Sequence, residues 1–185
     1  MGKLSNHICY LAGPMEALKD KGIKWRKDVT PILQQKYRVG VIDPCDKPSD
    51  YAAEDPQTLE KVIQLREAGR FEEYVEWAKR MVGIDYRSVH KADFLILYID
   101  KDVHMCGTYV EMTIATQERK PVLIVCKQGK KKISGFPWGM IPHQMMFDNF
   151  DDMFVYLGKV DSGEDTNDFR RWHFWDHDKI YGRKI

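Results

Sequence analysis

The sequence predicts an α/β fold in which a parallel sheet of four to five strands carries helices on both faces. Short apolar runs that suit strands alternate with longer stretches whose apolar residues recur at helical spacing. These runs are Ile8–Ala12, Val39–Ile42, Phe94–Ile99 and Val122–Cys126. The run from Phe94 is apolar along its whole length and flanked by charge, as expected for a strand covered on both faces. Such alternation forms parallel sheets through right-handed crossovers.

Composition excludes several classes of protein. The chain has 185 residues, with 29 Lys and Arg against 28 Asp and Glu, so no charge excess favours a nucleic-acid polymer or a membrane surface. The four cysteines, Cys9, Cys45, Cys106 and Cys126, form no CxxC pair, and no histidine has metal-ligand spacing. We therefore expect reduced thiols, no metal and a cytoplasmic location. No apolar run approaches a membrane span, and the N-terminus lacks a signal-peptide pattern.

The first strand stops at Gly13-Pro14, and a helix is expected from Glu16 to Tyr37. Gly22 interrupts this stretch, so the helix either bends there or starts afresh at Ile23. Pro31 predicts a second restart, because a proline inside a helix removes one backbone hydrogen bond.

Two further helices are expected at residues 58–68 and 71–89, joined at Gly69. The second carries an apolar stripe made of Phe71, Tyr74, Val75, Ala78, Val82 and Tyr86. The polar stretch between residues 46 and 55 contains Pro48 and is expected to form a loop over the site.

Beyond the fourth strand the signals are weaker. Met145–Phe147 is a candidate edge strand, and residues 150–157 predict a short helix capped by Asp148 or Asn149. We expect residues 1–158 to form one catalytic α/β domain, and residues 159–185 to form an extension that docks on this body or on a partner subunit. That extension is polar but carries the aromatic residues Trp172, Phe174, Trp175 and Tyr181.

The candidate chemistry lies around the strand at residues 94–99, because ligands of open parallel sheets bind beyond the carboxyl ends of the strands. Asp102 and Glu111 follow this strand, Asp85 precedes it, and Tyr10 lies on the first strand. Glu111 is expected in the first turn of the next helix. Converging carboxylates repel unless one is held neutral as an acid and another stays charged as a nucleophile, which is the arrangement used in glycosyl cleavage. The plainer interpretations are that Glu111 complements a helix dipole and that Tyr10 is a core residue.

The residues that carry a family resemblance are Tyr10–Pro14, Asp85, Asp93–Tyr98, Gly107–Glu111, Ala115 and Lys120–Val122. In these segments the chain resembles the nucleoside 2-deoxyribosyltransferase family. The resemblance follows the order of elements from about residue 7 to residue 126. It implies a flavodoxin-like or Rossmann-like sheet, an enzyme that cleaves the N-glycosidic bond of 2′-deoxyribonucleosides, and transfer of the sugar to another base or to water.

The resemblance also implies roles for single residues. Glu111 matches the nucleophile that attacks C1′, Tyr10 matches the phenol beside it, and Asp85 matches the acid that protonates the departing base. The family has one further Asp, but Met105 stands at that position here; either Asp102, three residues earlier, takes its place or the role is missing.

The candidate substrate-binding residues are Gly13, Pro14, Asp43, Gly107 and Thr108. Gly107 and Thr108 lie where free backbone N–H groups at a helix start bind an anion or a hydroxyl, and related enzymes that hydrolyse nucleoside 5′-monophosphates need such a cradle for phosphate. The pair Asp43-Pro44 has a plainer interpretation as the end of a strand.

Two functions remain open from the sequence. The first is an enzyme that cleaves the N-glycosidic bond of a nucleoside or its 5′-monophosphate, acts without a cofactor and forms a homodimer or higher homo-oligomer, as the resemblance implies. The second is a catalytically silent nucleotide-binding or sensing protein of the same fold, which the departure at Met105 favours. A flavin-binding module is disfavoured because Gly13-Pro14 does not begin a phosphate-binding loop.

Overall fold

The computed structural model describes residues 2–16, 18–47, 55–164 and 171–172. Its centre is a five-stranded sheet in the order β2-β1-β3-β4-β5, with every neighbouring pair parallel. The strands are β1 (Ile8–Ala12), β2 (Gly40–Ile42), β3 (Phe94–Ile99), β4 (Val122–Cys126) and β5 (Met146–Phe147). The predicted α/β fold is confirmed, and this strand order is that of flavodoxin-like folds.

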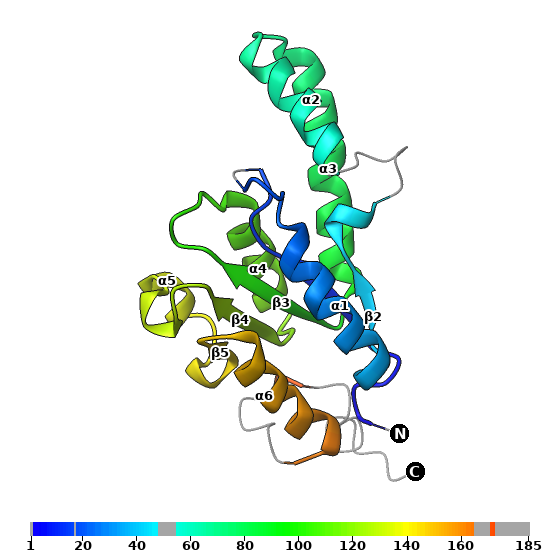
Figure 1. Ribbon diagram of the computed structural model, residues 1–185, viewed down its shortest axis with the longest axis vertical. Helices are drawn as coiled ribbons and strands as arrows, with labels where there is room; N and C mark the ends of the chain where they lie inside the picture. Colours follow the sequence, from blue (N-terminus) through cyan, green and yellow to red (C-terminus); the bar gives the residue numbers. More distant parts are fainter. Residues whose placement is uncertain (1, 17, 48–54, 165–170, 173–185) are drawn as a thin grey trace.

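Helices cover both faces of the sheet (Figure 1). They are α1 (Ile23–Tyr37), α2 (Pro56–Glu67), α3 (Phe71–Lys91), α4 (Cys106–Gln117), α5 (Gly135–Trp138) and α6 (Phe150–Ser162), with the 3₁₀ turns η1 (Pro44–Asp46), η2 (Lys130–Lys132) and η3 (His143–Met145). On one face α1 meets α6, where Trp25 stacks on Phe150 with ring centroids 5.8 Å apart. On the other face α3 packs beside α4. Within the described ranges, every helix is too short or too polar to cross a lipid bilayer.

The expected first helix begins later than residue 16. Residues 18–22 form a bend and turns, and α1 starts at Ile23, so the fresh start expected there is confirmed. Gly22 has φ +73°, and a Cβ there would lie 2.4 Å from the carbonyl oxygen of Pro14, so only glycine allows this close return of the chain. The predicted restart at Pro31 is wrong: α1 runs through it, because Pro31 is exposed and water can satisfy the carbonyl that it leaves unpaired.

Helices α2 and α3 form a hairpin that projects beyond the body of the molecule (Figure 1). Asp55 caps α2 by accepting hydrogen bonds from the backbone N–H groups of Gln57 and Thr58. The apolar stripe predicted on α3 is partly uncovered, and its exposed members are Phe71, Val75, Val82 and Tyr86. Most of the loop expected over the site, residues 48–54, lies outside the described residues.

At the C-terminal end, α6 is longer than expected and continues to Ser162. Asn149 is its cap, as predicted, and its side chain accepts a hydrogen bond from the N–H of Asp152. Trp172 is fully buried, with its ring 5.3 Å from that of Phe94 and its indole N–H donating to Tyr156 Oη at 2.7 Å. The other aromatic residues of this extension, Phe174, Trp175 and Tyr181, lie outside the described residues.

Candidate active site

A cavity of about 190 Å³ opens where the carboxyl ends of β1 and β3 meet the α2–α3 hairpin and the start of α4. Tyr10 enters it from β1, Asp85 from α3 and Glu111 from α4. Parallel pairing of Tyr10 with Leu95 and Ile42 places β1 between β2 and the central strand β3. Distant segments of the chain therefore bring these three side chains into one hollow.

A phenol joins the two carboxyl groups. Tyr10 Oη donates to Glu111 Oε1 at 2.6 Å and lies 3.4 Å from Asp85 Oδ1. All three residues are buried. One oxygen of each carboxyl group contacts the same phenol oxygen, so these two oxygens are at most about 6 Å apart, below the roughly 6.5–9.5 Å that separates the carboxyl groups of inverting glycosidases.

Glu111 lies deeper in α4 than expected. The helix begins at Cys106, so Glu111 occupies its second turn rather than its first. The first turn is made by Cys106, Gly107 and Thr108, which line the cavity instead. The helix dipole acts mainly within the first turn, so the geometry weakens the interpretation of Glu111 as a dipole partner.

Asp85 is held between opposing influences. Burial raises the pKa of its carboxyl group, and the neighbouring Lys47, Tyr10 and Arg26 act in the opposite direction without cancelling the effect. Lys47 Nζ lies 2.5 Å from Asp85 Oδ1, and the two side chains are only 7% and 13% exposed. Burial therefore favours the neutral, proton-donating form of Asp85.

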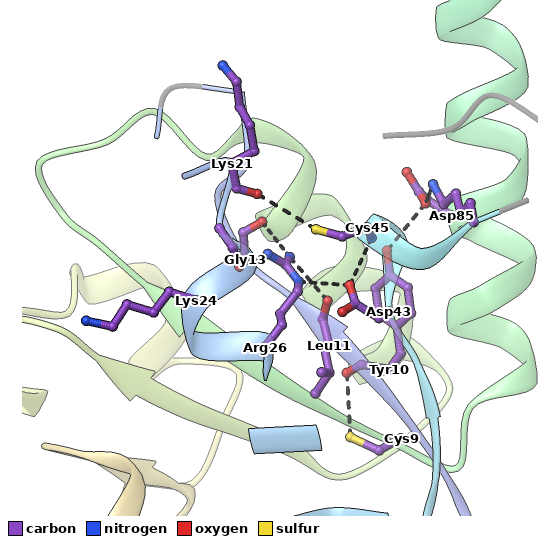
Figure 2. A network of polar contacts seen from close by, with 12 residues as sticks. Cys9, Tyr10, Leu11, Gly13, Lys21, Lys24, Arg26, Asp43, Cys45 and Asp85 are labelled. Atoms are coloured by element: carbon purple, nitrogen blue, oxygen red, sulfur yellow. Dashed lines mark hydrogen bonds and ion pairs between the residues drawn. The ribbon is translucent and has the colours of Figure 1, made fainter. Parts of the chain in front are cut away.

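Arg26 supports the floor of the cavity. Its buried guanidinium donates to the carbonyl oxygens of Gly22 at 2.9 Å and of Gly13 at 3.2 Å, and its Nε lies 3.4 Å from Asp43 Oδ1 (Figure 2). Asp43 also accepts a hydrogen bond from the N–H of Cys45 at 2.8 Å, which starts η1. Asp43 does not line the cavity. In the structure Asp43 therefore supports Arg26 and the start of η1.

The remaining predicted binding residues do line the cavity. Gly13 and Pro14 form the wall after β1, and Gly107 and Thr108 form the wall at the start of α4. The N-cap of α4 is Met105, whose side chain accepts no hydrogen bond from the helix. Backbone N–H groups of the first turn are therefore not capped by that side chain.

The structure does not bring Asp102 to the site. Its side chain is 64% exposed and bonds to Lys101 at 2.5 Å and to Gln128 Nε2 at 3.0 Å. Asp100 explains this position. It accepts hydrogen bonds from Lys127 and Gln128, and these bonds tie the loop after β3 to the end of β4. Met105 lines the cavity, and Asp102 lies outside it.

No family model matches the chain, and no curated protein matches it. Among solved structures, it is similar to a conserved protein from Enterococcus faecalis V583, with 13% identity, a TM-score of 0.47, and coverage of 82% of this chain and 86% of the other. It is also similar to the CMP N-glycosidase BcmB from Clostridium botulinum, with 14% identity, a TM-score of 0.45, and coverage of 82% and 98%.

We did not predict from the sequence that helix α3 forms one wall of the cavity. Tyr74, Trp77 and Met81 line it together with Asp85. These four positions recur at intervals of three and four residues, so they share one side of the helix, which meets the apolar stripe at Tyr74. That spacing was the available signal. Lys47 had no comparable signal, because its partner Asp85 lies 38 positions along the chain.

Proposed function

We propose that this protein cleaves the N-glycosidic bond of a nucleoside or deoxynucleoside, or of its 5′-monophosphate, with Glu111 as the nucleophile. The observation that carries the proposal is the bridge of Tyr10 between Glu111 and Asp85 inside a cavity. A short separation between two carboxyl groups, one of them with a raised pKa, suits double displacement through a covalent glycosyl intermediate.

The reaction would proceed in two steps. A carboxylate oxygen of Glu111 forms a bond to C1′ while the C1′–N bond breaks, and the electron pair of that bond stays on the base. Asp85 gives its proton to the departing base and becomes a carboxylate. A second base or a water molecule then attacks C1′ and releases Glu111, and Asp85 recovers a proton from the attacking group. Tyr10 orients the nucleophile through its 2.6 Å hydrogen bond.

The cavity walls supply complementary surfaces for such a substrate. Tyr74, Trp77 and Met81 offer flat aromatic and polarisable contacts for a base. The first turn of α4, with Gly107 and Thr108, offers N–H groups for a sugar hydroxyl or a phosphate. Base and sugar would then lie on either side of Asp85 and Glu111.

The test is incubation of the whole chain with a panel of deoxynucleosides, nucleosides and their 5′-monophosphates, with and without an acceptor base. Chromatography of the free base is the measurement. We expect the wild type and Asp102→Asn to release free base, and Glu111→Ala to release none. Base release that survives Glu111→Ala would overturn the role of this residue.

A silent nucleotide-binding protein is the second candidate, because Met105 stands in the cavity where the family that this chain resembles has a carboxylate. That candidate predicts a rise in melting temperature with a nucleotide and no base release from any member of the panel. Transfer to an acceptor base, detected as a new nucleoside, would exclude it.

We also propose that the protein is a homodimer paired along α3. Phe71, Val75, Val82 and Tyr86 are 38–59% exposed along this helix. Phe71 and Tyr86 are equally distant in sequence from the midpoint between positions 78 and 79, and so are Val75 and Val82. A two-fold axis requires this reciprocity, since an isologous contact uses the same surface on both subunits. An antiparallel pair of α3 helices would place Phe71 against Tyr86 of the partner subunit.

The test of this pairing is the mass of the whole chain in solution. Light scattering should give a dimer for the wild type and a monomer for Val75→Glu. Val155→Glu is the matched control, because Val155 is also exposed but lies on α6, and it should stay dimeric. A monomeric wild type, or a Val75→Glu variant that remains dimeric, would overturn the proposal.

A further inference from the structure

The segment after β2 brings a lysine against Asp85, one of the residues that line the candidate active site. Asp43 starts η1 by accepting the N–H of Cys45, and the turn ends at Asp46. Lys47 follows directly and reaches Asp85 on α3, with 2.5 Å between Nζ and Oδ1. Burial of both side chains removes most of the water that would screen this pair, so the contact is far stronger than an ion pair on the surface.

Lys47 belongs to a continuous polar chain with Asp85, Tyr10 and Glu111. Asp85 contacts Lys47 and Tyr10, and Tyr10 donates to Glu111. The charged and titratable groups that face Asp85 among the described residues therefore come from the η1 segment, β1 and α4, with Arg26 of α1 acting at longer range. Lys47 is the cation in direct contact with Asp85.

An acid that protonates a leaving group must exist in both protonation states during each turnover. Burial without a cation holds a carboxyl group neutral, which makes it a weak donor and leaves its anion unstabilised. A buried ammonium group that contacts the carboxyl group favours its ionised form, the carboxylate. The two influences balance only when both are present, and a general acid works best when its pKa is near the operating pH.

We propose that Lys47 is a positioning residue that sets the pH range in which Asp85 acts as the acid. This inference rests on the proposed cleavage of an N-glycosidic bond. When the C1′–N bond breaks, the proton leaves Asp85 for the base, and the ammonium of Lys47 neutralises the carboxylate that forms. Lys47 keeps its own proton throughout, and Asp85 is reprotonated by the water or base that attacks in the second step.

The experiment measures the rate of base release against pH for the wild type, Lys47→Met, Lys47→Arg and the control Lys159→Met, whose lysine is exposed on α6. The basic limb of the profile, where Asp85 loses its proton, should move up by about one to three pH units in Lys47→Met. It should keep its wild-type position in Lys47→Arg and Lys159→Met. Circular dichroism and melting temperature report whether each variant folds.

A second substrate separates this role from a purely structural one. A 7-methylpurine nucleoside releases its base without needing a proton, so Lys47→Met should cleave it at a rate close to that of the wild type. Equal losses on both substrates with an unmoved basic limb would overturn the role of Lys47 and leave the proposed function intact. A wild type that releases no base from any substrate would overturn the proposed function, and the role of Lys47 with it.

Discussion

Two pairs of carboxyl groups flank the central strand, and they differ in surroundings and in chemistry. Asp85 and Glu111 meet at the phenol of Tyr10 inside the cavity, and burial raises the pKa of Asp85. Asp100 and Asp102 follow β3 directly and bond to lysines and to Gln128. Nearness to the end of a strand is common to both pairs, so it does not by itself make a carboxylate catalytic.

The pKa values of the second pair, Asp100 and Asp102, are shifted in the opposite direction to that of Asp85. Burial would raise the pKa of Asp100, but hydrogen bonds from Lys127 and Gln128 outweigh it and hold that pKa below its ordinary value. A hydrogen bond from Lys101 lowers the pKa of Asp102. The charged form is therefore favoured at Asp100 and Asp102, where it stabilises a loop, whereas burial favours the neutral form at Asp85.

Replacing Glu111 should have the largest effect. Glu111→Gln keeps the shape of the side chain but removes the nucleophilic carboxylate, so base release should fall by at least about 10³-fold. Rates of base release from the best substrate of the panel are the measurement. Retention of more than a tenth of the activity would show that the buried pair is not the reacting one.

Asp85→Asn should reduce the same rate by about 10²–10⁴-fold, the usual contribution of a general acid. Because the neutral form of Asp85 is the active one and its folded pKa is raised, wild-type activity should fall as the pH rises through that pKa. The variant should lack this limb. A rate profile of Asp85→Asn that keeps the wild-type basic limb would assign the limb to another group.

Asp100→Asn should act on stability and leave the rate of base release unchanged. The side chain of Asp100 is only 2% exposed and bonds to a lysine and an amide, so the free energy of unfolding at neutral pH should fall by about 1–3 kcal/mol. The folded pKa is depressed, so this contribution is present above the unfolded pKa and is lost as pH falls through the folded one. Denaturant titrations at pH 7 and pH 3 should show a smaller difference from wild type at the lower pH.

Asp102→Asn should have the smallest effect. Its exposed carboxylate bonds to an exposed lysine, and such pairs contribute little to stability. Base release and melting temperature should both match the wild type. A large loss of base release, measured under the same conditions as for Glu111→Gln, would erase the distinction between the two pairs.

The buried strands were predictable from the sequence because short, continuous apolar runs flanked by polar residues are typical of strands covered on both faces. Phe94–Ile99 and Val122–Cys126 form β3 and β4 with the predicted ends. Helix α3 was predictable from its periodicity, but the pattern does not say how far the helix projects beyond the body, and so part of its stripe is exposed.

The site was only partly predictable. Tyr10, Asp85 and Glu111 are near strand ends or on the helices beside them, and the structure brings them together. Asp102 was misplaced because the direction of its loop depends on Gln128, a contact between segments 26 positions apart. Lys47 was missed for the same reason, since neither loop composition nor periodicity encodes a partner on another helix.

The burial of Trp172 has a practical consequence for recombinant expression. Its ring covers Phe94, the first residue of the central strand, and its indole N–H bonds to Tyr156 on α6. A shortened gene that ends before codon 171 would leave a large apolar hollow open to solvent, and the product would be prone to aggregate. Truncations from the C-terminal side should therefore keep Trp172 in the expressed chain.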